Sequence, residues 1–233
     1  MKFKRKTRKG FSLIELLVAT TIFALALVIA FGAFTLTLGN QSFVQANADV
    51  NTEGDRIARQ LSDDIINANG VGAATVGLTT YDNIKSLIFL NNDGYIIGSG
   101  IGGYGNGICY YREQTSCDRT ANTLILYYKN PDKVKVYYWD HIHGNLWSKS
   151  NNDSSILITD FNTFRLSITD RVNSDKVEVN RFSLTGATCS SAQCNQQPFA
   201  GIDLGVRTKS YDSKPPAKRA KFYIQTRVES RIQ

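Results

Sequence analysis

One carboxylate lies inside a long apolar stretch near the start of the chain. The 28 residues from Phe11 to Leu38 contain a single charged side chain, Glu15. Placing an ionised carboxylate in membrane hydrocarbon costs about 2.5–3.5 kcal/mol on insertion scales, and a cation that pairs with it at low dielectric offsets part of this cost. We therefore expect Glu15 either to find a charged partner or to reach the membrane face without a specific role.

Four cysteines form two close pairs in the sequence. Seven residues separate Cys109 from Cys117, and four separate Cys189 from Cys194. An even number of cysteines in close pairs is typical of disulfides in an oxidising compartment, whereas structural zinc sites usually have a tighter spacing. The spacing favours disulfides over a four-thiolate zinc site, and it leaves the connectivity open.

Other patterns that suggest chemistry lack the context they need. The G-x-G-x-x-G match at Gly98–Gly103 is not followed by the helix that a dinucleotide site requires. His141 and His143 could face one metal from a strand, but no third ligand follows at a useful spacing, so a hairpin end is the better interpretation. We find no nucleophile–base set and no calcium-loop spacing. The sequence therefore predicts no enzyme activity, no metal site and no cofactor.

Positive charge gathers at both ends of the chain. Residues 1–10 carry six lysines or arginines and no acid, and Arg207–Arg231 have a net charge of +6 within a total of +7. The second cluster includes a basic loop, KPPAKRAK, beside aromatic residues. Its candidate contact residues are Lys214, Lys218, Arg219 and Lys221. Such a loop can hold phosphates and stack bases of a nucleic acid, but we favour a solvated loop or a contact with another subunit.

The apolar stretch that contains Glu15 is long enough to cross a membrane. A helix of 28 residues covers about 42 Å, and the hydrocarbon core needs about 30 Å. The six preceding cations predict a single-pass protein of the cytoplasmic membrane, with its N-terminus inside and the remainder outside. The length of the stretch, and the lack of a small-residue cleavage site after it, distinguish it from an ordinary secretory signal peptide.

An amphipathic pattern continues the apolar stretch. Apolar residues recur near helical spacing at Phe43, Val44, Val50, Ile57, Leu61 and Ile65. The sequence NANGVG, from Asn67 to Gly72, ends the pattern. We expect one helix from about Phe11 to Asn69, with weak points at Gly32, Gly39 and Gly54.

Short apolar runs separated by turn residues occupy the chain from Val71 onward. The expected strands are Ser86–Leu90, Tyr95–Ile97, Thr123–Lys129, Val134–Trp139, Asn145–Trp147, Ser155–Thr159, Thr163–Thr169, Lys176–Ser183 and Lys221–Val228. The predicted fold class is α+β, with an antiparallel sheet of at least four strands packed on the lower helix. The predicted segments are residues 1–10, 11–38, 39–70 and 71–233: a leader, a membrane helix, its amphipathic continuation and an extracytoplasmic β-rich domain.

The residues around Glu15 resemble the type III signal of the type IV pilin and pseudopilin superfamily. Lys9 to Ala19 reads KGFSLIELLVA: a basic leader that ends in glycine, an aromatic residue, and a glutamate four residues later. The resemblance implies that a prepilin peptidase cuts between Gly10 and Phe11, and that Phe11 is then N-methylated. It also implies that Glu15 pairs with the Phe11 amine of a neighbouring subunit during assembly.

The order of the later elements is similar to that of W-type minor pilins and the J-type minor pseudopilin of type II secretion. This resemblance implies a structural subunit that assembles from the membrane with other pilin or pseudopilin subunits. Two alternatives stay open. One is a DNA-binding minor pilin of a DNA-uptake pilus, and the other is an extracytoplasmic binding module held by a signal anchor.

Overall fold

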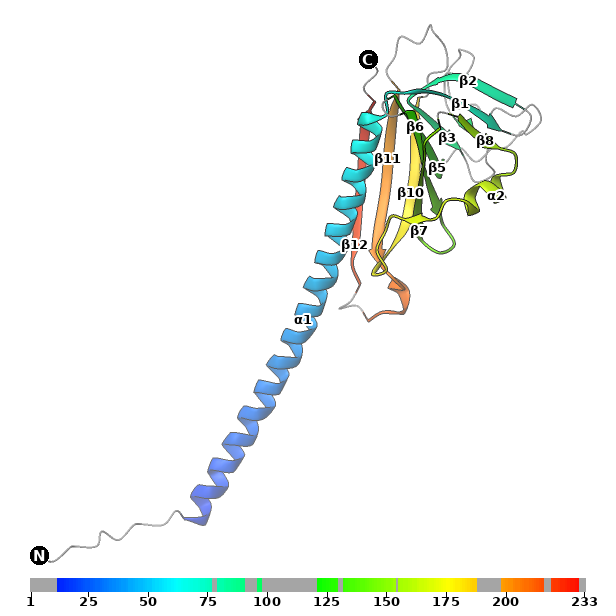
Figure 1. Cartoon of the computed structure of the whole chain (residues 1–233). Coiled ribbons are helices and arrows are strands. Elements are labelled where there is room, and N and C mark those ends of the chain that lie inside the picture. Colours follow the sequence, from blue (N-terminus) through cyan, green and yellow to red (C-terminus); the bar gives the residue numbers. More distant parts are fainter. Residues whose placement is uncertain are drawn as a thin grey trace, which may run out of the picture. The chain divides into compact units, whose positions relative to one another are not determined.

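The structure is a computed structural model that describes residues 12–76, 79–90, 96–97, 121–129, 132–153, 155–187, 198–215 and 219–230. The chain forms two compact units, Met1–Gln45 and Ala46–Gln233. We call the second unit the head. A long helix and mostly antiparallel strands make up the described residues (Figure 1), which confirms the predicted α+β fold class.

The helix α1, Leu13–Asn67, is close to the single helix that the sequence predicts. Gly32 and Gly39 do not interrupt it. Every residue from Ser12 to Leu38 is exposed, and the helix contains a stretch near its N-terminal end that is long and apolar enough to cross a membrane. This segment therefore fits a single-pass membrane anchor.

The strands of the head form three sheets. The first has the order β2-β1-β8, with β1 Val71–Val76, β2 Thr79–Lys85 and β8 Ser155–Ile158. The second has the order β4-β3-β5-β6-β7-β9, with β3 Leu87–Leu90, β4 Ile96–Ile97, β5 Thr123–Lys129, β6 Asp132–Asp140, β7 Asn145–Asn151 and β9 Asp170–Arg171. The third has the order β10-β11-β12, with β10 Val177–Ala187, β11 Phe199–Thr208 and β12 Lys221–Glu229. Among the described pairs, β1 and β8 run parallel and the others antiparallel.

The six-stranded sheet is buried on both faces, and β5 shows why its sequence is almost continuously apolar. Leu124 and Leu126 face the cluster that includes the head's part of α1, while Ile125 and Tyr127 face a second cluster that includes β8. Because successive strand residues point to opposite faces, a strand covered on both sides shows no alternation.

One predicted strand is wrong. Residues Thr163–Thr169 were expected to be a strand because Phe164, Leu166 and Ile168 alternate, yet Phe161–Leu166 forms the short helix α2. The Asp160 carboxylate caps this helix by accepting hydrogen bonds from the backbone N–H groups of residues 162 and 163. Phe161 and Phe164, three residues apart, pack against the second core cluster, and Leu166 stays exposed.

The strand β11 was not predicted, although it is the centre of the third sheet. Its buried residues alternate along Ala200, Ile202, Leu204 and Val206, but two glycines between them weaken the strand propensity. Its central position in the sheet stabilises β11 as a strand, because β10 and β12 form hydrogen bonds with it on both sides.

The part of α1 in the head carries an apolar stripe and a polar stripe side by side. Val50, Ile57, Leu61 and Ile65 are each 0 % exposed, and burying a side chain of this size contributes about 1.5–3 kcal/mol. The apolar stripe shares one core cluster with residues of the third sheet and with residues on one face of the six-stranded sheet. Figure 1 shows the upper part of α1 beside β11 and β12. It confirms the predicted amphipathic pattern within the head.

Each residue of the polar stripe comes directly before a residue of the apolar stripe in the sequence. Its members are Asp49, Glu53, Arg56, Gln60 and Asp64. Each member bonds to another part of the head: Asp49 to Lys176, Glu53 to the Ser174 N–H at 2.7 Å, Arg56 to the Val172 carbonyl, Gln60 to Tyr137, and Asp64 to Lys135 at 2.7 Å and to Tyr137. These bonds fix the rotation of the helix about its axis.

Gly54 lies in the apolar stripe, where the helix packs directly against Phe222 of β12. A Cβ atom at this position would lie 2.2 Å from Cδ1 and 2.6 Å from Cγ of Phe222. The glycine is therefore a packing requirement, and the sequence-based interpretation of Gly54 as a weak point in the helix misses this role.

We predict that Gly54→Ala destabilises the head by about 1–3 kcal/mol, because overpacking outweighs the gain of about 1 kcal/mol in helix propensity. Phe222→Leu in the same chain should recover part of the loss. Gly39→Ala is the matched control, since nothing lies within 4 Å of a Cβ there. Urea unfolding of the full chain in detergent micelles, followed by tryptophan fluorescence, measures the effect. Equal stability of Gly54→Ala and wild type would contradict the packing role.

The contact that Glu53 makes between the helix and the rest of the head should weaken in acid. Hydrogen bonding to Arg56 is the main cause that lowers its pKa below the ordinary 4.5, and the Ser174 N–H adds to this. A carboxylate whose pKa is lower in the folded chain than in the unfolded chain stabilises the fold at pH values above its unfolded pKa. This stabilisation is lost as the pH falls through its folded pKa.

We predict that Glu53→Gln lowers the free energy of unfolding by about 1 kcal/mol at pH 7, and that the difference from wild type disappears near pH 3. The exposed Asp63→Asn serves as the control and should change the free energy by less than half as much. A difference between Glu53→Gln and wild type that stays constant from pH 7 to pH 3 would show that charge is not the cause. The same urea titrations provide the measurement.

Candidate functional site

The first turn of α1 is closed by a reciprocal pair of hydrogen bonds. The Glu15 N–H donates to Oγ of Ser12 at 3.3 Å, and the Ser12 N–H donates to Oε2 of Glu15 at 2.9 Å. This is a capping box, in which two side chains satisfy two backbone donors that the helix cannot satisfy itself. The negative charge also lies at the positive end of the helix dipole. The sequence signal S-x-x-E was available but was overlooked.

The two oxygens of Glu15 differ in their contacts. Among the described residues, Oε2 accepts the Ser12 N–H and Oε1 accepts no hydrogen bond. The cap thus orients the carboxylate through Oε2. Gly10 and Phe11, the predicted cleavage and methylation residues, lie outside the described residues.

The remaining polar side chains of the apolar stretch are satisfied within the helix. The hydroxyl groups of four threonines donate to backbone carbonyls three or four residues earlier, at 2.8–2.9 Å: Thr20, Thr21, Thr35 and Thr37. A polar group in hydrocarbon needs an internal partner because water is absent. The helix therefore meets the requirements of a membrane environment at these four threonines.

The basic loop between β11 and β12 is built around one tyrosine. The Tyr211 ring lies 5.6 Å from the guanidinium groups of both Arg207 and Arg219, and 4.7 Å from Nζ of Lys221. Arg219 also donates to the backbone carbonyl of Lys214 at 2.7 Å. Tyr211 is in the short helix η1, Tyr211–Ser213. The structure thus brings together Lys214, Arg219 and Lys221, while Lys218 lies outside the described residues.

This geometry does not favour the stacking of bases in the loop. The three cations around Tyr211 occupy the neighbourhood that a stacked base would need, and Phe222 turns inward against Gly54. Tyr223 is 53 % exposed, but Arg181 lies 5.4 Å from its ring. The aromatic residues that suggested nucleic-acid binding are therefore used within the head.

The two histidines lie in the turn between β6 and β7, as the hairpin interpretation predicted. His143 contacts the Asp140 carboxylate through Nδ1 at 2.6 Å, whereas His141 packs edge-on to Trp139. The two rings therefore have different partners. Among the described residues, no group of three histidine, cysteine, aspartate or glutamate side chains could hold a metal ion.

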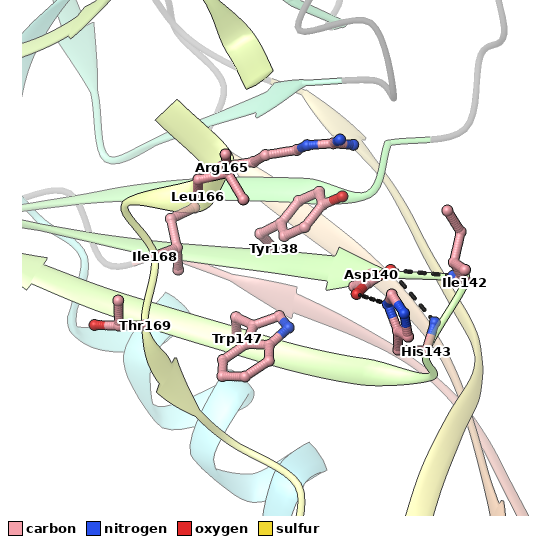
Figure 2. A pocket seen from close by; sticks show the side chains of 9 residues that line it. All are labelled: Tyr138, Asp140, Ile142, His143, Trp147, Arg165, Leu166, Ile168 and Thr169. Atoms are coloured by element: carbon pink, nitrogen blue, oxygen red, sulfur yellow. Dashed lines mark hydrogen bonds and ion pairs between the residues drawn. The ribbon is translucent and has the colours of Figure 1, made fainter. Parts of the chain in front are cut away.

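A cavity of ≈450 Å³ lies beside this turn. It is lined by Tyr138, Asp140, Ile142, His143, Trp147, Arg165, Leu166, Ile168 and Thr169 (Figure 2). Figure 2 shows the Asp140 carboxylate turned toward the backbone N–H groups of Ile142 and His143 and toward the His143 ring. Because both carboxylate oxygens hold the turn, the Asp140–His143 pair acts as a hairpin clamp.

Several predicted features lie outside the described residues. These are the four cysteines, Cys109, Cys117, Cys189 and Cys194, and the glycine-rich stretch Gly98–Gly103. The disulfides therefore stay a prediction.

Comparison with known protein families matches residues 5–31 to the prokaryotic N-terminal methylation motif. The chain thus carries the signal of type IV prepilins, as the resemblance around Glu15 predicted. The motif indicates a substrate of prepilin peptidase, and it implies assembly with other pilins in a membrane. The comparison with curated proteins finds no match, and the comparison with solved structures finds none.

The capping box predicts how substitutions affect the helix start. Ser12→Ala and Glu15→Ala should each speed amide hydrogen exchange in the first turn of α1 by roughly fivefold, because losing a cap costs about 1 kcal/mol. Glu15→Gln should leave the exchange close to wild type, since glutamine also serves in a capping box. Thr21→Ala is the control and should not affect the first turn. Exchange measured by NMR on the full chain in micelles tests this, and equal rates in all four variants would exclude the cap.

Proposed function

We propose that this protein is a structural subunit of a type IV pilus or a type II secretion-like filament. In this proposal, prepilin peptidase removes residues 1–10, the amine of Phe11 is methylated, and the α1 helix holds the subunit in the membrane until assembly. The head lies outside the cytoplasmic membrane, and the predicted boundaries at residues 10, 38 and 70 belong to the same proposal.

The observation that carries the proposal is the coincidence of the methylation motif with a carboxylate that caps the helix. Residues 5–31 match the motif, and within it Oε2 of Glu15 belongs to the capping box while Oε1 has no donor among the described residues. Ser12 and Glu15 both follow the proposed cut, so the cap survives processing. We infer that Oε1 contacts the cationic Phe11 amine of a neighbouring subunit, where low dielectric strengthens the pair.

We assign the protein to the minor pilins or minor pseudopilins within this class. Processing would leave a chain of 223 residues with a large β-rich head, which suits a subunit present in few copies better than a repeated one. We rank the DNA-uptake alternative below this assignment, because the aromatic residues near the basic loop have partners within the head. The signal-anchored binding module ranks below both, because it leaves the methylation motif without a role.

The processing step has a direct test. Mass spectrometry of the full chain, expressed with its peptidase, should find a 223-residue product that begins with N-methylphenylalanine. Gly10→Val should block the cut. An intact Met1 in the wild-type chain would overturn the proposal.

Two variants separate the docking role of Glu15 from its capping role. Glu15→Gln keeps the cap but removes the charge, whereas Ser12→Ala weakens the cap but keeps the charge. We expect Glu15→Gln to be processed normally and to fall at least tenfold in filament incorporation. Ser12→Ala should incorporate much better than Glu15→Gln. Normal incorporation of Glu15→Gln in sheared filament fractions would refute the docking role.

A further inference from the structure

The basic loop lies at the end of the head where α1 enters it. The Lys209 N–H donates to the Lys176 carbonyl at 3.0 Å, and Nζ of Lys176 lies 3.4 Å from Asp49. Ala220, just before β12, shares a core cluster with Val50. Figure 1 shows the described part of this loop after β11 in orange. Asp49 is the fourth residue of the head, so the loop lies near the N-terminal end of the head's part of α1.

Four cations on this loop keep a net positive charge after the ion pairs are removed. Lys209 and Lys221 are exposed, and Lys214 and Arg219 are partly exposed. We call these four residues the proximal patch. None of them forms an ion pair with an acid among the described residues.

The acids near the proximal patch have other cationic partners. Asp49 pairs with Lys176 at 3.4 Å, and Arg207 pairs with Glu178 at 2.5 Å and with Asp212 at 3.4 Å. Asp175 pairs with Arg171. The four cations of the patch thus face one acid, Asp212, that is not fully neutralised, which leaves about three uncompensated charges on one small surface.

The length of the connecting chain limits how far this surface can lie from the membrane in the proposed membrane-held subunit. The apolar stretch ends at Leu38, and eleven residues lead from there to Asp49. Even a fully extended chain of that length reaches only about 40 Å. A tethered patch meets the membrane surface at a high effective concentration, so weak electrostatic contacts are enough for binding.

We propose that the proximal patch docks the head on anionic phospholipid headgroups while the subunit is still in the membrane. This inference rests on the proposed function, because it requires a membrane-held chain. Lysine and arginine side chains near an anionic surface each strengthen binding by roughly fivefold, and salt screens this attraction. The partly exposed Tyr211 between the cations suits the headgroup region, where tyrosine is enriched.

The opposite end of the head offers an internal reference. The backbone N–H of Lys129 donates to the Asn69 side chain at 3.3 Å, which places the β5–β6 hairpin at the far end of α1. Asp49 and Asn67 are separated by about 27 Å along the helix. Lys129 and Lys133 on this hairpin should therefore not reach a surface on which the proximal patch rests.

Lysine acetylation in nanodiscs tests the proposal on the full chain. Nanodiscs of phosphatidylcholine alone are compared with nanodiscs that also contain phosphatidylglycerol, and mass spectrometry gives the acetylation rate of each lysine. We expect Lys209, Lys214 and Lys221 to react roughly fivefold more slowly on the anionic discs. Lys129 and Lys133 should react equally on both, and high salt should remove the protection.

Two matched variants sharpen the test. Lys209→Glu with Lys221→Glu should abolish the protection of Lys214, whereas Lys129→Glu with Lys133→Glu should preserve it. The salt titration of the wild-type chain supplies the same information if the first variant does not fold. Equal rates on both kinds of nanodisc would overturn the proposal.

Two other outcomes are distinguishable. If duplex DNA added to phosphatidylcholine discs protects the patch and phosphatidylglycerol does not, the partner is a nucleic acid and the proposal is wrong. If the chain fails to insert into either kind of nanodisc, the membrane-held subunit itself is refuted. Insertion with equal lysine rates would refute only the docking.

Discussion

The structure depends on one helix that must suit two environments. In its apolar part, each polar side chain has a partner on the same helix, because hydrocarbon offers none. In the head, the same helix packs an apolar stripe into the core, and an adjacent polar stripe bonds to other parts of the head and fixes its rotation. The sheets, the Gly54 contact and the position of the basic loop all follow from how the head packs on this segment.

Glu15 connects the two tasks of the N-terminal segment. The carboxylate that gives the prepilin signal its character is also the residue that closes the helix. A carboxylate with one oxygen held by the cap is oriented before any partner arrives. In the pairing between subunits that we propose, this orientation lowers the entropic cost of forming the contact.

The N-terminal signal could be recognised from the sequence because it depends only on the order of residues. A peptidase signal is a fixed order of residue types, so the motif at residues 5–31 can be identified without knowing the fold. The roles of Gly10, Phe11 and Glu15 within it stay predictions. The amphipathic helix could also be predicted, since its apolar residues recur with a period of about 3.6 residues in the sequence. The capping role of Ser12 is also encoded locally, because S-x-x-E spans only the first turn of the helix.

The head was harder to predict because its decisive contacts lie far apart in the chain. Local alternation suggested a strand at Thr163–Thr169, but the Asp160 cap and the packing of Phe161 favour a helix. The glycines of β11 hid a central strand that its neighbours stabilise. The partners of the basic loop could not be deduced from its composition, since Tyr211 and the cations around it come together only when β11 and β12 pair.

The two stripes also limit how the chain can change in length. One residue added to α1 between Ala46 and Asn67 would turn every later residue by about 100°, and polar side chains would then face the core. Because 3.6 residues make a turn, an insertion of seven residues returns the stripes almost to register. Natural length variation in this helix should therefore occur in whole pairs of turns, and single-residue insertions should be confined to the loops of the head.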